Sequence, residues 1–195
     1  MGTLTPPSTD GRVARRENTR EVIIDAATDL FAARGVTSTS IDDIAAAAGI
    51  AKGSVYYNFE SKAGLVEAIV ARNSELMATA LREATQGRTG ADLRDEVVRA
   101  LLRLVRDHAA GARVLVTELF RTERSWRVSI ERWRSLALSP LIDDMINNGE
   151  EPAVADIRAA AIVGATLVTG LEWLLFHPDR SYEQVSATVV NTLSR

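Results

Sequence analysis

Residues 37–65 read TSTSIDDIAAAAGIAKGSVYYNFESKAGL, and this stretch decides the fold because it predicts two short helices joined by a tight turn. Either Thr39 or Ser40 can cap the first helix, since an aspartate follows each of them three residues later and can complete a capping box. Apolar residues then recur at the spacing of one helical face. They are Ile41, Ile44, Ala45 and Ala48. Gly49 ends this helix, because glycine tolerates the positive φ that closes a helix and turns the chain.

A second short helix is predicted from Lys52 to Phe59. Val55 and Phe59 lie one turn apart and form its buried side. The other side chains face outward and offer hydroxyl, amide and ammonium groups that can bind bases and phosphates. These outward residues are Lys52, Gly53, Ser54, Tyr56, Tyr57 and Asn58. Helix, turn and polar second helix together predict a helix-turn-helix unit that reads DNA.

Lys52 and Lys62 are the only lysines among 23 basic residues, and both stand where a helix should begin. The amino end of a helix already carries roughly half a positive charge, so a cation there suits a site that receives an anion. We interpret Lys52 as part of the reading surface and Lys62 as an anchor for a DNA phosphate. Thr39 is a further candidate for DNA contact.

Residues 42–65, DDIAAAAGIAKGSVYYNFESKAGL, resemble the DNA-binding segment of the TetR family of bacterial transcriptional regulators. The resemblance implies an all-helical homodimer that binds double-stranded DNA and, by family default, represses transcription until a small molecule releases it. The segment departs from the family pattern at Ala51, where a serine or threonine usually caps the reading helix; a missing cap costs about 1 kcal/mol. It departs again at Asn58, where the family often has histidine, arginine or tyrosine.

Charge is unevenly placed in the amino-terminal third of the chain. Residues 1–62 carry seven basic and eight acidic side chains, a net charge of −1, so this part is not basic as a whole. Four of the seven cations lie between Arg12 and Arg20, directly before the helix-turn-helix. Arg16 and Arg20 are therefore candidates for phosphate contacts. The alternative is a solvated arm that does not touch DNA.

Composition sets wider bounds on fold and function. With 195 residues, 46% of them hydrophobic, and a net charge of −3, the chain can bury a sizeable core. The absence of cysteine excludes disulfides and thiolate metal sites. No run approaches 18 apolar residues and the amino terminus lacks the order of a signal peptide, so we expect a cytoplasmic protein without membrane contact. No catalytic or metal-ligating constellation stands out, so we expect neither an enzyme nor a cofactor or metal.

Helical periodicity continues to the carboxyl terminus without an alternating strand pattern, and it predicts an all-α fold. Within the amino-terminal part, the first helix should run from near Asn18 to Arg34. The expected parts are a flexible arm (1–17), a helix-turn-helix DNA-binding domain (18–64), a connecting helix (65–87) and a helical regulatory and dimerisation domain (88–195).

In the regulatory domain, glycine and proline mark the predicted helix ends. We expect a break at Gly111 and a kink or division at Pro140. The most apolar helix should run from Asp156 to Phe176, and Ser181 with Gln184 forms a capping box for the last helix.

The last two helices are expected to pair with those of a second subunit in a four-helix bundle, as in the resembling family. A two-fold dimer would present two reading helices to successive major grooves, so the operator should be palindromic. The candidate interface residues are Gly164, Ala165, Leu171, Val185 and Val189. The alternative is that Gly164 and Ala165 only pack helices inside one subunit.

The resembling family encloses a ligand cavity in its second domain, and several large or polar residues are candidates for lining it here. They are His108, Glu118, Phe120, Trp126, Trp133, Met145 and Trp173. For each of them an ordinary core role is the stronger explanation, because large apolar residues at helical spacing usually pack in the core. His108 has three open assignments: a core histidine, a helix-end cation or a pocket group. The arginine-rich stretch 121–134 is either a solvated helix face or the attraction point for an acidic ligand such as an acyl-thioester.

A ligand-responsive transcriptional regulator accounts together for the helix-turn-helix, the two lysines and the large helical second part. A ligand-independent DNA-organising protein, or an activator on the same fold, is the alternative. The regulator would strongly prefer one palindrome over random duplex, whereas the DNA-organising protein would bind both with similar affinity.

Overall fold

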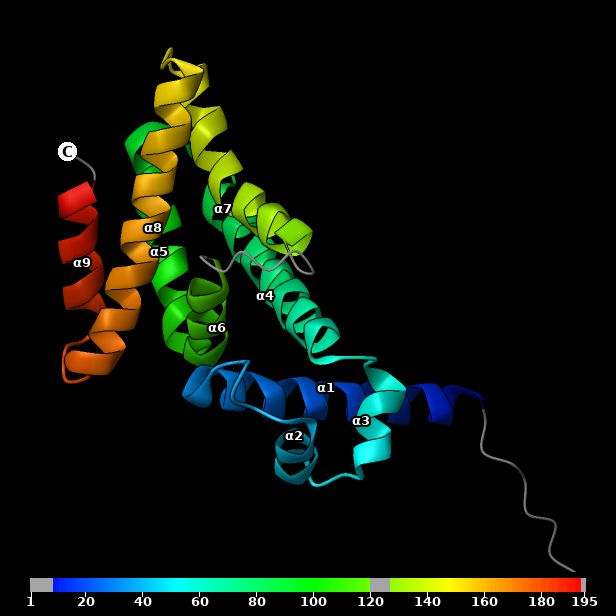
Figure 1. Ribbon diagram of the computed structural model, residues 1–195. Coiled ribbons are helices and arrows are strands. Elements are labelled where there is room, and N and C mark those ends of the chain that lie inside the picture. The colour runs from blue at the N-terminus through cyan, green and yellow to red at the C-terminus, as the bar shows by residue number, and fades with distance from the viewer. Residues whose placement is uncertain (1–8, 120–126, 194–195) are drawn as a thin grey trace, which may run out of the picture. The chain divides into compact units, whose positions relative to one another are not determined.

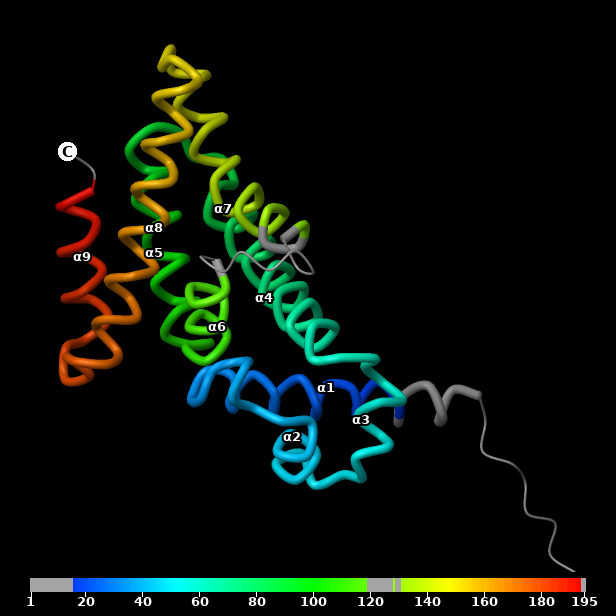
Figure 2. The backbone as a smooth tube through the Cα atoms, viewed as in Figure 1, coloured from blue at the N-terminus to red at the C-terminus, as the bar shows by residue number. Residues whose placement is uncertain are grey.

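The computed structural model describes residues 9–119 and 127–193, and every regular element in these two stretches is an α-helix (Figure 1). The predicted all-α fold is therefore confirmed. Figure 2 traces the same path as a tube. In chain order the helices are α1 (Thr9–Arg34), α2 (Ile41–Ala48), α3 (Lys52–Asn58), α4 (Lys62–Thr85), α5 (Gly90–Asp107), α6 (Ala109–Leu119), α7 (Arg127–Asn147), α8 (Pro152–Phe176) and α9 (Tyr182–Leu193).

The chain divides within α4 into two compact units, Met1–Ala68 and Ile69–Arg195. α4 begins at Lys62, three residues before the start predicted for the connecting helix. Ser61 caps it, because its hydroxyl accepts a hydrogen bond from the Gly64 N–H at 3.2 Å. The predicted boundaries of the DNA-binding, connecting and regulatory parts stay predictions.

In the first unit, α1 lies across α2 and α3 (Figure 1). Its apolar side is buried, with Ile23 and Ala27 fully enclosed. Ile44 from α2 and Val55 from α3 are enclosed as well. Since burial of each isoleucine or valine side chain contributes roughly 1.5–3 kcal/mol, one small core holds the helix-turn-helix in place.

The first helix starts earlier than the sequence suggests. It begins at Thr9 rather than near Asn18, so the predicted flexible arm is corrected for residues 9–17, which are helical. The added stretch includes Gly11, and one glycine in a helix costs only about 1 kcal/mol. Arg16, on this added stretch, stacks on an aromatic ring of α3, and that contact favours the longer helix.

In the second unit, α8 packs against α5, α6, α7 and α9, and Figure 1 shows it between α9 and α7. The contact with α5 is close at Gly170, where a Cβ atom would come within 3.0 Å of Val105 Cγ1. Gly164 on the same helix is open, because a Cβ atom there would meet nothing within 4 Å. The two glycines of α8 therefore have different surroundings within the subunit.

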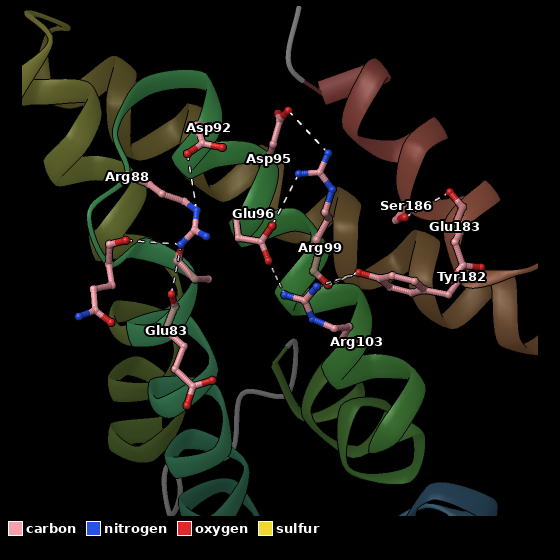
Figure 3. Close-up of polar contacts among 12 residues, drawn as sticks. Glu83, Arg88, Asp92, Asp95, Glu96, Arg99, Arg103, Tyr182, Glu183 and Ser186 are labelled. Carbon is pink, nitrogen blue, oxygen red and sulfur yellow. Dashed lines mark hydrogen bonds and ion pairs between the residues drawn. The ribbon is translucent and has the colours of Figure 1, made fainter.

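Tyr182 joins α9 to α5 (Figure 3). Its hydroxyl donates to the Arg99 carbonyl oxygen at 3.1 Å and accepts from Arg103 Nη1 at 3.3 Å. The Arg106 guanidinium lies 5.0 Å from the ring centroid, within cation–π range. Arg103 also pairs with Glu96 at 2.5 Å, which holds the guanidinium beside the tyrosine.

Two helix boundaries differ from the predictions for reasons of packing. α5 ends at Asp107, and Gly111, predicted as the break, lies inside α6. Gly111 is glycine because the Asn73 side chain occupies the space that a Cβ atom would need. α7 continues through Pro140 without division, and the buried residues Leu138 and Leu141 on either side keep the helix packed.

The ends of α8 and α9 follow simple local rules. α8 begins at Pro152, four residues before the predicted start, because proline suits the first turn of a helix, where its missing N–H is not needed. The predicted capping box of α9 is confirmed. The Ser181 hydroxyl accepts from the Gln184 N–H at 3.2 Å, and the Ser181 N–H donates to Gln184 Oε1 at 3.0 Å.

Among the described residues, α8 alone is long and apolar enough to cross a membrane by length and composition. The core helix of a globular protein passes the same test, and α8 packs against four other helices. We therefore assign it as the central helix of the second unit.

Candidate nucleic-acid interface

Ser40, rather than Thr39, caps the first helix of the helix-turn-helix. Its hydroxyl accepts from the Asp43 N–H at 3.1 Å, while the Ser40 N–H donates to Asp43 Oδ2 at 2.9 Å, which confirms a capping box. Hydrogen bonding from Ser40 lowers the pKa of Asp43 below its ordinary value of 3.8. Gly49 follows with φ at 66°, as predicted, and the Ile50 N–H donates to the Ala45 carbonyl at 3.0 Å to close the turn.

Thr39 lies inside the fold. Its exposed fraction is 1%, and its hydroxyl donates to the Gly35 carbonyl oxygen at 2.9 Å. The side chain therefore secures the carboxyl end of α1, and the prediction that it contacts DNA is corrected. A residue one position before a helix cap can face either way, and only the path of the turn decides which.

α3 has a polar face that is exposed and an apolar face that is buried. Val55 and Phe59 are buried as predicted, and Ala51 supplies no side-chain cap, which also matches the sequence. The exposed residues of α3 are Lys52, Gly53, Tyr56 and Tyr57. These four form the outer face of α3.

Ser54 and Asn58 lie at the edge of that face. Both are half-buried, and the Asn58 Nδ2 donates to the Ser54 carbonyl oxygen at 2.8 Å. The Asn58 amide is thus folded back onto its own helix, and its predicted outward position is corrected. With Asn58 turned inward, the outer face relies on tyrosine and lysine.

Arg16 and Arg20 of α1 lie beside α3. The Arg16 guanidinium is 5.2 Å from the Tyr57 ring centroid, and the Arg20 guanidinium is 5.1 Å from that of Phe59. Both arginine side chains are exposed and can reach a phosphate, although Arg20 Nη1 also lies 3.7 Å from Glu21 Oε1. Tertiary contact therefore brings the two predicted arginines next to the reading helix.

Lys52 is paired with Asp42 from the first turn of α2. The Lys52 Nζ lies 2.9 Å from Asp42 Oδ1 and 3.0 Å from Oδ2, and both side chains are more than half exposed. The hydrogen bond to Asp42 raises the pKa of Lys52 above its ordinary value of 10.5. The lysine is therefore charged and partly neutralised by its neighbour.

The Lys62 ammonium group is hydrogen-bonded within the protein. Its Nζ donates to the carbonyl oxygens of Val36, Thr37 and Thr39 at 3.0, 3.2 and 3.0 Å. An ammonium group has three protons, so these bonds occupy all of them. Lys62 ties the turn between α1 and α2 to the start of α4, which differs from the phosphate anchor that the sequence suggests.

Sequence reasoning missed two residues of this region. The capping role of Ser61 could have been predicted, because a serine directly before a predicted helix is an ordinary capping signal. Asp42 was considered only as a possible member of the capping box. Its pairing with Lys52 spans ten residues and two helices, and no local periodicity marks it.

The second unit contains a small apolar cavity of about 30 Å³ among α4 to α8. Of the predicted pocket residues, Trp133 and His108 line it, together with Asn73 and aliphatic side chains. His108 is exposed at the carboxyl end of α5 and so combines the helix-end and pocket assignments. A volume of this size holds about one water molecule, so the cavity is too small for a larger ligand in this conformation.

The other pocket candidates lie elsewhere. Glu118 and Met145 are buried but are not among the residues that line the cavity. Trp173 borders a groove of about 530 Å³ between α8 and α9, where its indole Nε1 donates to the Arg180 carbonyl oxygen at 3.0 Å. Phe120 and Trp126 lie outside the described residues.

The candidate dimer residues separate into two groups. Val185 and Val189 are buried within the subunit, which corrects their assignment to a dimer surface. They face inward because α9 packs against both α5 and α8. Gly164 is at the surface, and Ala165 and Leu171 are half-buried.

Comparison with known proteins agrees with this geometry. A family model described as "Bacterial regulatory proteins, tetR family" matches residues 23–69. The HTH-type transcriptional repressor KstR2 of Rhodococcus jostii is 42% identical over 67 residues, which are 34% of this chain and 32% of that protein. The match therefore spans about a third of that relative. The HTH-type transcriptional regulator TtgR of Pseudomonas putida is 28% identical over 176 residues, covering 84% of this chain and 83% of TtgR.

Solved structures share the fold across both units. A bacterial regulatory protein of the tetR family from Rhodococcus RHA1 aligns with a TM-score of 0.78 at 24% identity, covering 91% of this chain and 95% of that one. FadR from Bacillus subtilis, in complex with stearoyl-CoA, aligns with a TM-score of 0.72 at 19% identity, covering 89% and 97%. Taken with the capped helix, the glycine turn and the exposed face of α3, these matches show that residues 23–69 form a DNA-binding segment of the kind found in bacterial regulatory proteins of the tetR family, and that the chain shares the fold of such regulators across both units.

Proposed function

We propose that this protein is a dimeric transcriptional regulator, a repressor by family default, that binds a palindromic operator and is released by a small molecule. The observation that carries the proposal is the outer face of α3, with Lys52, Gly53, Tyr56 and Tyr57 exposed on a helix held by buried Val55 and Phe59. A rigid short helix with polar groups on one side suits the major groove, where base edges offer hydrogen-bond partners.

Contacts to bases and to phosphates come from different helices in this proposal. Lys52 at the amino end of α3 and Tyr56 one turn later reach base edges, with half-buried Ser54 between them. Arg16 and Arg20 flank α3 and bind phosphates, which fixes the position of the helix without reading sequence. Lys62 acts as a positioning residue that holds the turn before α2.

An exposed apolar stripe on α8 supports a dimer. Its members recur at alternating spacings of four and three residues, the pattern of a helix that packs along another helix. They are Ile157, Ala161, Gly164, Val168, Leu171 and Leu175. Ile157 is 71% exposed and Val168 57%, which is unusual for large apolar residues of a central helix. Gly164 leaves room for close approach, and a two-fold dimer would carry two copies of α3.

The effector in this proposal has an apolar body and an anionic head. The cavity of the second unit is apolar, and it must open by side-chain movement to hold more than a water molecule. Arg132 on α7 is exposed and available to an acidic group, whereas Arg134 pairs with Asp156 at 3.2 Å. FadR, which shares the fold, was solved with stearoyl-CoA, so long-chain and short-chain acyl-CoA thioesters are the first effectors to test.

The test is selection of genomic DNA fragments by the full chain, followed by titration of the enriched duplex and a scrambled duplex at fixed salt. We expect a preference of about a thousandfold or more for one palindrome, within the range of specific regulators. Similar affinity for both duplexes would instead support a ligand-independent DNA-organising protein. An acyl-CoA that releases the operator, while free CoA does not, would support the effector class.

A further inference from the structure

We propose that Asp42 is a specificity-determining residue: it holds Lys52 away from phosphates on random DNA, so that the lysine contributes only on a matched operator. This inference rests on the proposed function, because it concerns the same surface of α2 and α3. It assigns a role to a carboxylate that would otherwise oppose DNA binding.

The geometry places the two groups in direct contact. Both Asp42 oxygens lie within 3.0 Å of the Lys52 Nζ. Asp42 is in the first turn of α2, and Lys52 is the first residue of α3, so the pair bridges the turn of the helix-turn-helix. Lys52 also lies near Tyr56, whose ring is half exposed on the same face. The pair therefore belongs to the surface proposed to meet DNA.

The ion pair between Asp42 and Lys52 is weak enough for contacts with DNA to replace it. The two side chains are 53% and 66% exposed, and solvent screens a surface ion pair of this kind so that it contributes little to stability. DNA with correctly placed partners can therefore displace it. On a random duplex, those partners are missing, and Asp42 also stands close to phosphates of the same charge, which disfavours the complex.

The balance of charge in this part of the chain makes one lysine important. Residues 1–62 sum to −1, and of the two lysines Lys62 is fully engaged with carbonyl oxygens. Random-duplex affinity comes almost entirely from cations that displace counterions from phosphates. A carboxylate that occupies Lys52 therefore withdraws one of the six other cations of residues 1–62 from that contribution.

The experiment compares four full-chain proteins: wild type, Asp42→Asn, Lys52→Gln and the double variant. Asp29→Asn is the matched control, because it removes an exposed carboxylate from α1 of the same unit. Affinities for the selected operator and for scrambled duplex are measured from about 50 to about 200 mM salt, the range in which counterion release is resolved.

We expect Asp42→Asn to tighten scrambled-duplex binding about threefold to tenfold and to steepen the salt dependence by about one counterion. Operator affinity should change less, so the ratio of the two affinities falls. In the Lys52→Gln background, Asp42→Asn should have no larger effect than Asp29→Asn.

Two results would overturn the inference while the proposed function stands. One is a scrambled-duplex affinity that rises equally in Asp42→Asn and Asp29→Asn. The other is an Asp42→Asn effect that persists without Lys52. A wild-type protein that prefers no duplex would overturn the proposed function, and this inference with it.

Discussion

Lys62 donates to three backbone carbonyl oxygens, whereas Lys52 faces one exposed carboxylate. Lys62→Met should therefore lower the free energy of unfolding by about 1–3 kcal/mol, since hydrogen bonds to a charged group are lost. Lys52→Met should change it by less than about 0.5 kcal/mol, as for most surface substitutions. Urea denaturation followed by circular dichroism measures both. Equal stability of the two variants would remove the structural role assigned to Lys62.

Ser40 is the residue on which α2 depends for its start. Ser40→Ala removes the hydroxyl that accepts from the Asp43 N–H, and loss of such a cap costs roughly 1 kcal/mol. Ser38→Ala, in the exposed turn just before it, is the control and should be neutral. Thermal melting of the two variants makes the comparison. A Ser38 effect as large as that of Ser40 would show that the whole turn, rather than the cap, sets stability.

The capping box also predicts a dependence on pH. The folded-state pKa of Asp43 is lowered by its hydrogen bonds to Ser40, so its stabilising contribution is complete above 3.8 and is lost as the pH falls through the lower folded value. The stability difference between wild type and Ser40→Ala should therefore shrink below pH 3.8. Urea denaturation at neutral and acidic pH tests this. A constant difference would mean that the Asp43 charge takes no part.

At the scale of elements, Tyr182 is the contact that docks α9 on α5 (Figure 3). Tyr182→Phe keeps the ring between Arg106 and Trp173 but removes the hydroxyl, which should cost about 1 kcal/mol. Amide hydrogen exchange should become faster in α9 and stay unchanged in α2 and α3. Tyr57→Phe, on the exposed face of α3, is the control. Unchanged exchange in α9 would mean that apolar packing alone holds it.

Helix existence followed from sequence more reliably than helix ends. The apolar spacing of α2, α3 and α8 and the capping box of α9 were readable, because they depend on residues three or four apart. The early start of α1 and the position of Gly111 inside α6 could not be predicted from the sequence. Both depend on side chains from other helices, Tyr57 in the first case and Asn73 in the second.

At the scale of the whole molecule, the stripe on α8 is the proposed dimer interface. Val168→Glu places a charge in the proposed dimer interface, so we expect monomers in analytical ultracentrifugation and a loss of at least tenfold in operator affinity, because the two copies of α3 are no longer linked. Val128→Glu on α7 is the matched control, since Val128 is 76% exposed and lies outside the stripe. Dimers of Val168→Glu with normal circular dichroism would rule out this interface.

The sequence by itself determined the local features: an all-α chain, a helix-turn-helix with its glycine turn, an uncapped reading helix and the apolar spacing of the second unit. Only the tertiary structure decided the roles of the two lysines, the burial of Thr39 and the position of Arg16 beside Tyr57. Caps, turns and helical faces are encoded within a few neighbouring residues. The bond from Lys62 to Val36 spans 26 residues, and the pairing of Lys52 with Asp42 depends on where two helices meet, so neither leaves a periodic trace in the sequence.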